Sequence, residues 1–119
     1  MGRIFAVATV ALLIGLQSHP AAASEQTGNT LLTDCGTGPI QDAAPTLSTG
    51  MCVGYIGGSV DVLRNMGLLC LTPTTTNGQV VDIVVKYLVD HPEWRDKEAH
   101  FVVYGALKDV FPCPKTPKS

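Results

Sequence analysis

The segment TNGQVVDIVVKYLVDHPE, residues 76–93, decides whether this chain is all-helical or contains a sheet. Its centre is rich in valine and isoleucine, which favour strands on propensity alone. The start of the segment favours a helix instead, because Thr76 followed three residues later by Gln79 is the pattern of a capping box. Asp82 and Lys86 also form an i,i+4 pair with the acid in the favourable N-terminal position. We therefore predict a helix here.

The end of this segment and the residues after it read DHPEWRD, residues 90–96. They place acids, an imidazole, an indole and a guanidinium together and raise the question of a reactive site. Pro92 suits the first position of a helix, where its missing N–H does no harm, and Asp90 or His91 precedes it as the cap. Glu93 then falls in the first turn, where the helix dipole favours an acid. A histidine acting as a base, His91 or His100, needs a nucleophile or a metal, and the sequence offers neither at suitable spacing. We interpret this segment as a joint between two helices.

A fourth helix is predicted to run from this joint to Pro112, because apolar residues recur at helical spacing at Ala99, Val102, Val103, Ala106, Leu107 and Val110. Asp96 and His100 are expected to pair on its exposed side. Trp94 and Arg95 lie near its start and belong to the residue types favoured at protein–protein interfaces. We take these two as candidate partner contacts, and a partly buried place at the edge of the core is the alternative for Trp94.

Two further helices are predicted upstream, over residues 29–35 and 47–66. The first would be capped by Asn29 or Thr30. The second carries apolar residues three and four positions apart, would be capped by Ser48 or Thr49 and would end at Gly67. Residues 36–46 contain two glycines and two prolines and are expected to form a loop. The predicted fold class is all-α, a small disulfide-stapled bundle of about four helices.

The second predicted helix has three glycines in its middle, Gly54, Gly57 and Gly58. Each lowers helix stability by about 1 kcal/mol relative to alanine. We expect another helix to approach this bare backbone closely and so offset the loss. The alternative is that the segment is a glycine-kinked strand or turn, and a phosphate-binding loop is disfavoured because no lysine is near.

Residues 1–23 are predicted to be a secretory signal peptide, with Arg3, a short apolar run and a cleavage site after about Ala23. Removing these 23 of the 119 residues leaves 96, with a helical domain over 24–113 and a mobile tail over 114–119. The net charge of the whole chain is −2 and charged residues make up 15%, so no basic patch favours nucleic acid. No other run is long and apolar enough to cross a membrane.

All four cysteines, Cys35, Cys52, Cys70 and Cys113, lie after the predicted cleavage site. An even number of cysteines in an exported chain favours two disulfides, and the spacing gives little support to a metal site. In an up-down bundle the end of the first helix meets the start of the second, and the end of the second meets the end of the fourth, which favours Cys35–Cys52 and Cys70–Cys113. That pairing is one of three connectivities.

Several of these segments resemble the Rap/Tai immunity-protein family over residues 31–113. One motif is CVGYIGGSVD, with Cys52, Gly54, Tyr55, Gly58 and Asp61 in the family's positions. The others are the Gly-Gln step at Gln79, the YLVDHPE run with His91 and Pro92, and the end AL…FPC with Phe111, Pro112 and Cys113. The segment LTPTTTNG is longer than the tight turn usual in the family.

The resemblance implies a small periplasmic helical protein, often a homodimer, that binds a peptidoglycan-cleaving amidase effector of type VI secretion. It implies steric occlusion of the amidase cleft by a loop, with no enzyme activity and no cofactor in this chain. The candidate loops are residues 36–46 and 71–78. The alternative from a different class is a small periplasmic helical stress or acid chaperone, or a structural binding protein without a toxin partner.

Overall fold

The computed structural model describes residues 25–115, so the predicted signal peptide and most of the predicted mobile tail lie outside the described residues. Four α-helices occur, α1 (Gly28–Cys35), α2 (Leu47–Asn65), α3 (Asn77–Asp90) and α4 (Ala99–Leu107). Two short 3₁₀ helices, η1 (Ile40–Asp42) and η2 (Pro92–Trp94), lie between them. Residues 25–115 form no strand, and the prediction of an all-α, disulfide-stapled bundle is confirmed. None of the helices described is long and apolar enough to span a bilayer.

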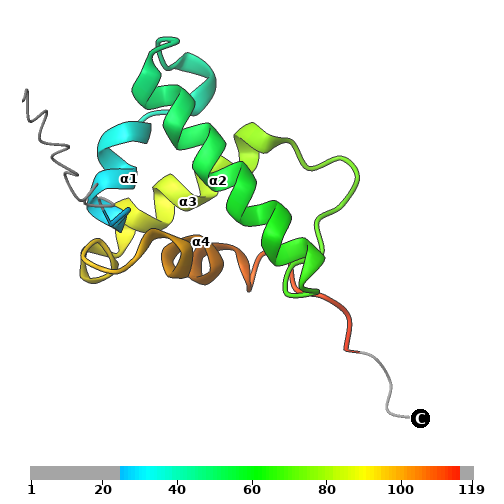
Figure 1. Ribbon diagram of the computed structural model, residues 1–119. Helices are drawn as coiled ribbons and strands as arrows, with labels where there is room; N and C mark the ends of the chain where they lie inside the picture. The colour runs from blue at the N-terminus through cyan, green and yellow to red at the C-terminus, as the bar shows by residue number, and fades with distance from the viewer. Residues whose placement is uncertain (1–24, 116–119) are drawn as a thin grey trace, which may run out of the picture.

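Helix α3 is the central element of the bundle and contacts α1, α2 and α4 (Figure 1). The predicted capping box is present: Gln79 N donates to Thr76 Oγ1 and Thr76 N donates to Gln79 Oε1. Five of its side chains are buried, Val80, Val81, Val84, Val85 and Leu88. The valines that on propensity favour a strand thus form one apolar helical face, because tertiary packing overrides local preference.

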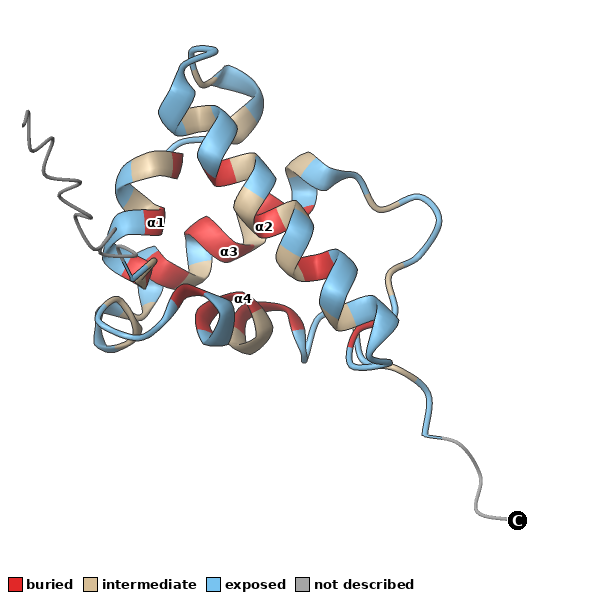
Figure 2. Ribbon diagram, in the orientation of Figure 1, coloured by how far each residue is buried: buried red, intermediate tan, exposed pale blue. Residues whose placement is uncertain are grey.

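The core is wholly apolar, and no buried polar or charged residue occurs among residues 25–115. Figure 2 shows the buried positions on the inner sides of all four helices. Leu31 of α1, Ile56 of α2 and Leu107 of α4 are each fully buried in one cluster with α3. The bundle therefore depends on hydrophobic burial for its shape, with hydrogen-bonded side chains at its periphery.

The segment before α1 is tied to the segment before α4 by three backbone hydrogen bonds. Gly28 N donates to Lys97 O at 2.9 Å, Asn29 N to Arg95 O at 2.6 Å, and Ala99 N to Gln26 O at 2.7 Å. Gly28 is buried, and only a residue without a side chain fits this close approach. These bonds hold the start of α1 against the residues that lead into α4.

The caps of both upstream helices lie earlier than predicted. The cap of α1 is Thr27, not Asn29 or Thr30, and the cap of α2 is Thr46, not Ser48 or Thr49. In each case an extended threonine accepts a hydrogen bond from the backbone three residues on. The predicted end of α2 is confirmed, since the helix stops at Asn65 and Gly67 has a φ of +73°.

The predicted start of the fourth helix at Pro92 is wrong. Pro92 begins the single 3₁₀ turn η2, and α4 begins at Ala99. The predicted Asp96–His100 pair is also wrong, because His100 Nε2 lies 3.3 Å from Glu98 Oε2. Asp96 precedes the helix and therefore does not lie one helical turn below His100.

The predicted Asp82–Lys86 pair is wrong for a tertiary reason. Lys86 has an aspartate four residues away on either side, and its ammonium bonds to Asp90. The Oδ1 atom of Asp82 accepts a hydrogen bond of 2.8 Å from the backbone N–H of Ile40 in η1. A contact from another segment thus determines which of the two aspartates Lys86 pairs with.

Candidate functional site

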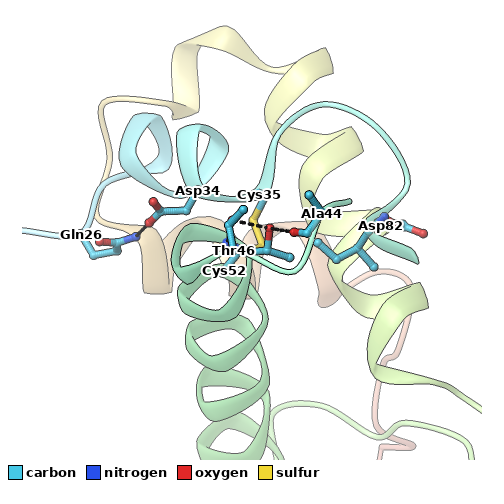
Figure 3. Close-up of a disulfide and its surroundings, with 9 residues drawn as sticks. Gln26, Asp34, Cys35, Ala44, Thr46, Cys52 and Asp82 are labelled. Carbon is cyan, nitrogen blue, oxygen red and sulfur yellow. Dashed lines mark hydrogen bonds between the residues drawn. A yellow bond between two sulfur atoms is a disulfide. The ribbon is translucent and has the colours of Figure 1, made fainter. Parts of the chain in front are cut away.

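The two predicted disulfides are both present, and they differ in exposure. Cys35, at the end of α1, is joined to Cys52 in α2 (Figure 3), with S–S 2.06 Å and Cα–Cα 5.1 Å. Both residues belong to the buried core. Cys70 is joined to Cys113 with S–S 2.03 Å, and there Cys70 is exposed and Cys113 half-buried. One bridge is therefore internal and the other lies at the surface.

The surface disulfide forms the root of an exposed loop, residues 71–76, between α2 and α3. The bond Cys70 N to Phe111 O, at 3.0 Å, reinforces the same root. At the other end the chain enters α3 through the capping box of Thr76. In Figure 1 this loop stands away from the helices. The loop is therefore fixed at its two ends, and its tip is free.

The tip of this loop is uncharged and is stabilised by its own threonines. Thr72 Oγ1 lies 2.8 Å from Thr75 Oγ1 and 3.3 Å from Thr74 Oγ1, and Thr75 N donates to Thr72 O. Thr72, Pro73 and Thr74 are exposed. Hollows of about 430 and 310 Å³ flank the loop, one beside Phe111 and one beside Asp61. A protein with a narrow cleft could accept this tip with little rearrangement of the loop.

The second candidate loop, residues 36–46, is held more closely to the bundle. It contains η1, whose Ile40 N–H is bonded to Asp82 of α3, and Thr49 Oγ1 donates to Ala44 O. All of its residues except Ile40 and Ala43 are exposed, and the stretch from Gly36 to Pro39 lies in front of a hollow of about 360 Å³ that reaches Val85 and Lys86. This loop is therefore tied to α3 in its middle, at Ile40, whereas the side-chain hydrogen bonds of Thr72 to Thr75 stay within the 71–76 loop.

The residues of the DHPEWRD joint make local contacts. The ring of His91 stacks on Tyr87 at 4.2 Å, and its Nδ1 lies 2.9 Å from Tyr87 O. Trp94 is half-buried against the core, and its ring centre lies 6.0 Å from that of Tyr87 in an edge-on arrangement. Arg95 donates from Nε to Leu88 O at 2.7 Å and from Nη2 to Val89 O at 2.9 Å. These contacts close the C-terminal end of α3.

The motif residues of α2 fall on different sides of that helix. Gly54, Gly58 and Asp61 are exposed, and Asp61 lies 4.0 Å from Arg64. Tyr55 is half-buried, and burial raises the pKa of its hydroxyl although a hydrogen bond with Ser59 acts in the opposite direction. Among residues 25–115 the expected helix contact is missing at two of the three glycines, because Cβ atoms built on Gly54 and Gly58 meet nothing within 4 Å. Gly57 alone faces another element, at 3.5 Å from the side chain of Asn77.

The other motif residues have structural positions. Gln79 completes the capping box of α3, and Pro92 begins η2. Phe111 is half-buried beside the 71–76 loop, and Pro112 is exposed between it and Cys113. The motif therefore does not gather into one site. Residues 25–115 contain no group of three or more His, Cys, Asp or Glu side chains arranged to hold a metal ion.

An apolar groove between α2 and α4 was not predicted from the sequence. It has a volume of about 550 Å³ and is lined by Val62, Leu63, Met66, Leu68, Phe101 and Tyr104, among others. Four of these six side chains are exposed, Val62, Met66, Leu68 and Phe101. The helical spacing of Val62 and Met66 was a usable signal for an apolar surface on this helix.

Comparison with known proteins gives one match. The family model described as Rap1a immunity proteins matches residues 27–113, which cover all four helices and both disulfides. No curated protein and no solved structure matches the chain.

Proposed function

Since the chain belongs to the family of Rap1a immunity proteins, we propose that it acts in the periplasm as an immunity protein against a type VI effector that cleaves peptidoglycan as an amidase. It binds the effector and blocks the cleft sterically. The predicted signal peptide and the two disulfides support an oxidising compartment outside the cytoplasm. All four cysteines are used in these bridges, which favours a binding role over thiol chemistry.

The observation that carries the mechanism is the 71–76 loop. Its root is fixed by the Cys70–Cys113 bridge and by α3, and its exposed tip carries no charge. A loop that is already ordered loses little conformational entropy on binding, so more of the contact energy contributes to affinity. Phe111 lies at the edge of the same surface. We propose that Thr72 to Thr74 enter the cleft and that substrate is excluded by volume.

We propose two secondary features of this function. Trp94 and Arg95 flank the contact with the effector, although both also have the local roles described above. The protein is a homodimer, which the low share of charged residues, 15%, supports because a self-associating surface carries fewer charges.

The experiment compares the two candidate loops with matched substitutions. Thr74→Arg at the tip of the 71–76 loop is expected to weaken inhibition of a purified peptidoglycan amidase effector at least tenfold. Thr37→Arg in the 36–46 loop introduces the same side chain at another exposed threonine and is expected to leave inhibition within twofold. The reverse pattern would move the contact to the 36–46 loop.

The chaperone alternative is tested in parallel. Prevention of aggregation of acid-denatured client proteins, together with no binding to any amidase and no rescue of growth in cells that express one, would replace the immunity proposal. The fold would be unaffected by that result.

A further inference from the structure

A hollow of about 430 Å³ lies between the 71–76 loop and α3. Its lining includes Thr72 and Thr74 of the loop, Asp82 and Ile83 of α3, and Phe111. Both threonines also belong to the exposed tip that is proposed to enter the effector cleft. A protein surface that receives the tip therefore also covers this hollow.

Asp82 brings to the hollow a charge that has no ion-pair partner among residues 25–115. Its side chain is half-buried, and Oδ1 accepts a hydrogen bond from Ile40 N–H. Within the described residues this is the only hydrogen bond of the carboxylate, although an ionised carboxylate can accept about four. The ion pairs of the same residues involve other acids, and Lys86, one helical turn away, is bonded to Asp90.

Docking of the loop tip changes the surroundings of this carboxylate. In the free protein Asp82 is half-buried, so water still reaches its charge. A surface that closes over the hollow removes that water, and burial of an ionised carboxylate is costly unless the charge is paired and hydrogen-bonded. A tight complex therefore requires a positive charge at this point of the interface.

The walls of the hollow suit a long cationic side chain. Its volume falls within the range of about 300–1,000 Å³ that is typical of small-molecule pockets, so a single arginine or lysine side chain fits. Ile83 and Phe111 are half-buried and offer apolar surface to the methylene groups of such a side chain. The ring of Phe111 can also face the cation, which adds a favourable interaction.

We propose that an arginine or lysine on the rim of the effector cleft enters this hollow and pairs with Asp82 when the 71–76 loop enters the cleft. The inference rests on the proposed function and adds the charge that the partner must present. Thr72 to Thr74 exclude substrate from any cleft of suitable width. Asp82 distinguishes an effector that presents a cation at its rim from one that presents an acid or an uncharged group.

Asp82→Asn is the decisive variant, because it removes the charge and keeps an oxygen that can accept the hydrogen bond from Ile40. It should inhibit a purified peptidoglycan amidase effector at least tenfold more weakly, and circular dichroism confirms that the variant is folded. Asp34→Asn is the matched control. Asp34 is also half-buried and also accepts a hydrogen bond, from Gln26, but it does not line the hollow, so inhibition should stay within twofold.

Lys86→Met tests the other source of positive charge. Lys86 lies four residues from Asp82 and could turn from Asp90 to Asp82 when the effector binds. If the effector supplies the cation, Lys86→Met leaves inhibition within twofold. A loss equal to that of Asp82→Asn would mean that the chain neutralises its own carboxylate, and this would overturn the proposal.

The last experiment identifies the cation on the effector. Each arginine and lysine on the rim of its cleft is replaced by methionine in turn. At one position the change should weaken inhibition by the unmodified protein at least tenfold, and inhibition by Asp82→Asn less than threefold, because the two side chains act as a pair. Independent effects at every position, or full inhibition by Asp82→Asn, would overturn this inference alone. No inhibition by the unmodified protein would overturn the proposed function and this inference with it.

Discussion

Asp82 of α3 holds Ile40 of η1 through a hydrogen bond of 2.8 Å from the backbone N–H to the carboxylate Oδ1. The two residues are 42 positions apart, and the bond fixes the loop before α2 against the central helix. Asp82→Ala leaves this half-buried N–H without a partner and is expected to lower the free energy of unfolding by about 1–3 kcal/mol. Asp82→Asn keeps an oxygen acceptor and should recover most of that loss. Urea unfolding measures both, and equal stability of the two variants would contradict the assignment.

Gly28 is predicted to be the glycine most sensitive to substitution. A Cβ atom there would lie 2.9 Å from the Arg95 Cα, from Leu88 Cδ2 and from Trp94 O, and the two backbone atoms cannot easily yield. Gly28→Ala should therefore lower the free energy of unfolding by about 1–3 kcal/mol. Gly54→Ala, where nothing lies within 4 Å, should raise it by about 0.5–1 kcal/mol. Thermal unfolding of the two variants shows whether the loss of stability is specific to the close approach at Gly28 or follows from replacing any glycine.

The two disulfides should respond differently to reductant. Attack by a thiolate needs access to a sulfur, and Cys70 is exposed whereas Cys35 and Cys52 are buried. Mild reduction followed by alkylation and mass spectrometry should label Cys70 and Cys113 first. Labelling of Cys35 and Cys52 at the same rate would mean that the core opens before reduction.

Removal of either bridge should also destabilise the fold. With separations of 17 and 43 residues, the loop-entropy model gives about 3 kcal/mol for Cys35–Cys52 and about 4 kcal/mol for Cys70–Cys113. Paired cysteine-to-alanine variants, measured by urea unfolding, test this. Loss of the surface bridge is additionally expected to weaken effector binding, because the root of the 71–76 loop is no longer fixed.

The carboxyl group of Asp90 should titrate below its ordinary range. The ammonium of Lys86 donates a hydrogen bond to it, and this interaction with the charged form lowers the pKa of Asp90. The stability that the pair contributes is therefore complete above the ordinary aspartate pKa and is lost as the pH falls through the lowered value. Titration of the carboxyl carbon by NMR should show the shift, and Lys86→Met should abolish it. Lys97→Met, whose lysine lies beside Asp96, serves as the control.

The predictions that the structure confirms depend on local sequence signals or on the order of the helices. The Thr76–Gln79 capping box identified α3 as a helix in spite of its valines, and Gly67 identified the end of α2. The order of the helices also led to the disulfide pairing, because in an up-down bundle the end of α1 meets the start of α2 and the ends of α2 and α4 lie together. Each of these predictions depends on residues within a few positions of one another, or on chain order alone.

Several of the failed predictions depend on contacts between distant segments. Lys86 had an aspartate four residues away on either side, and Asp82 is instead bonded to Ile40, which no local pattern relates to it. Pro92 is as suitable for a 3₁₀ turn as for an α-helix, and the bonds from Gly28 and Asn29 to Lys97 and Arg95 accompany a later start of α4. Another helix was expected to lie against the three glycines of α2, but only Gly57 faces one, through the side chain of Asn77 in α3.

The order of the disulfides has a consequence for oxidative folding. The first cysteine pairs with the second and the third with the fourth, so the two covalent rings do not overlap along the chain. A polypeptide that enters an oxidising compartment from its N-terminus can close each ring as soon as the next thiol arrives. Oxidation in order of emergence then gives the native pairing directly, and maturation requires an oxidant but no reshuffling of mispaired bonds.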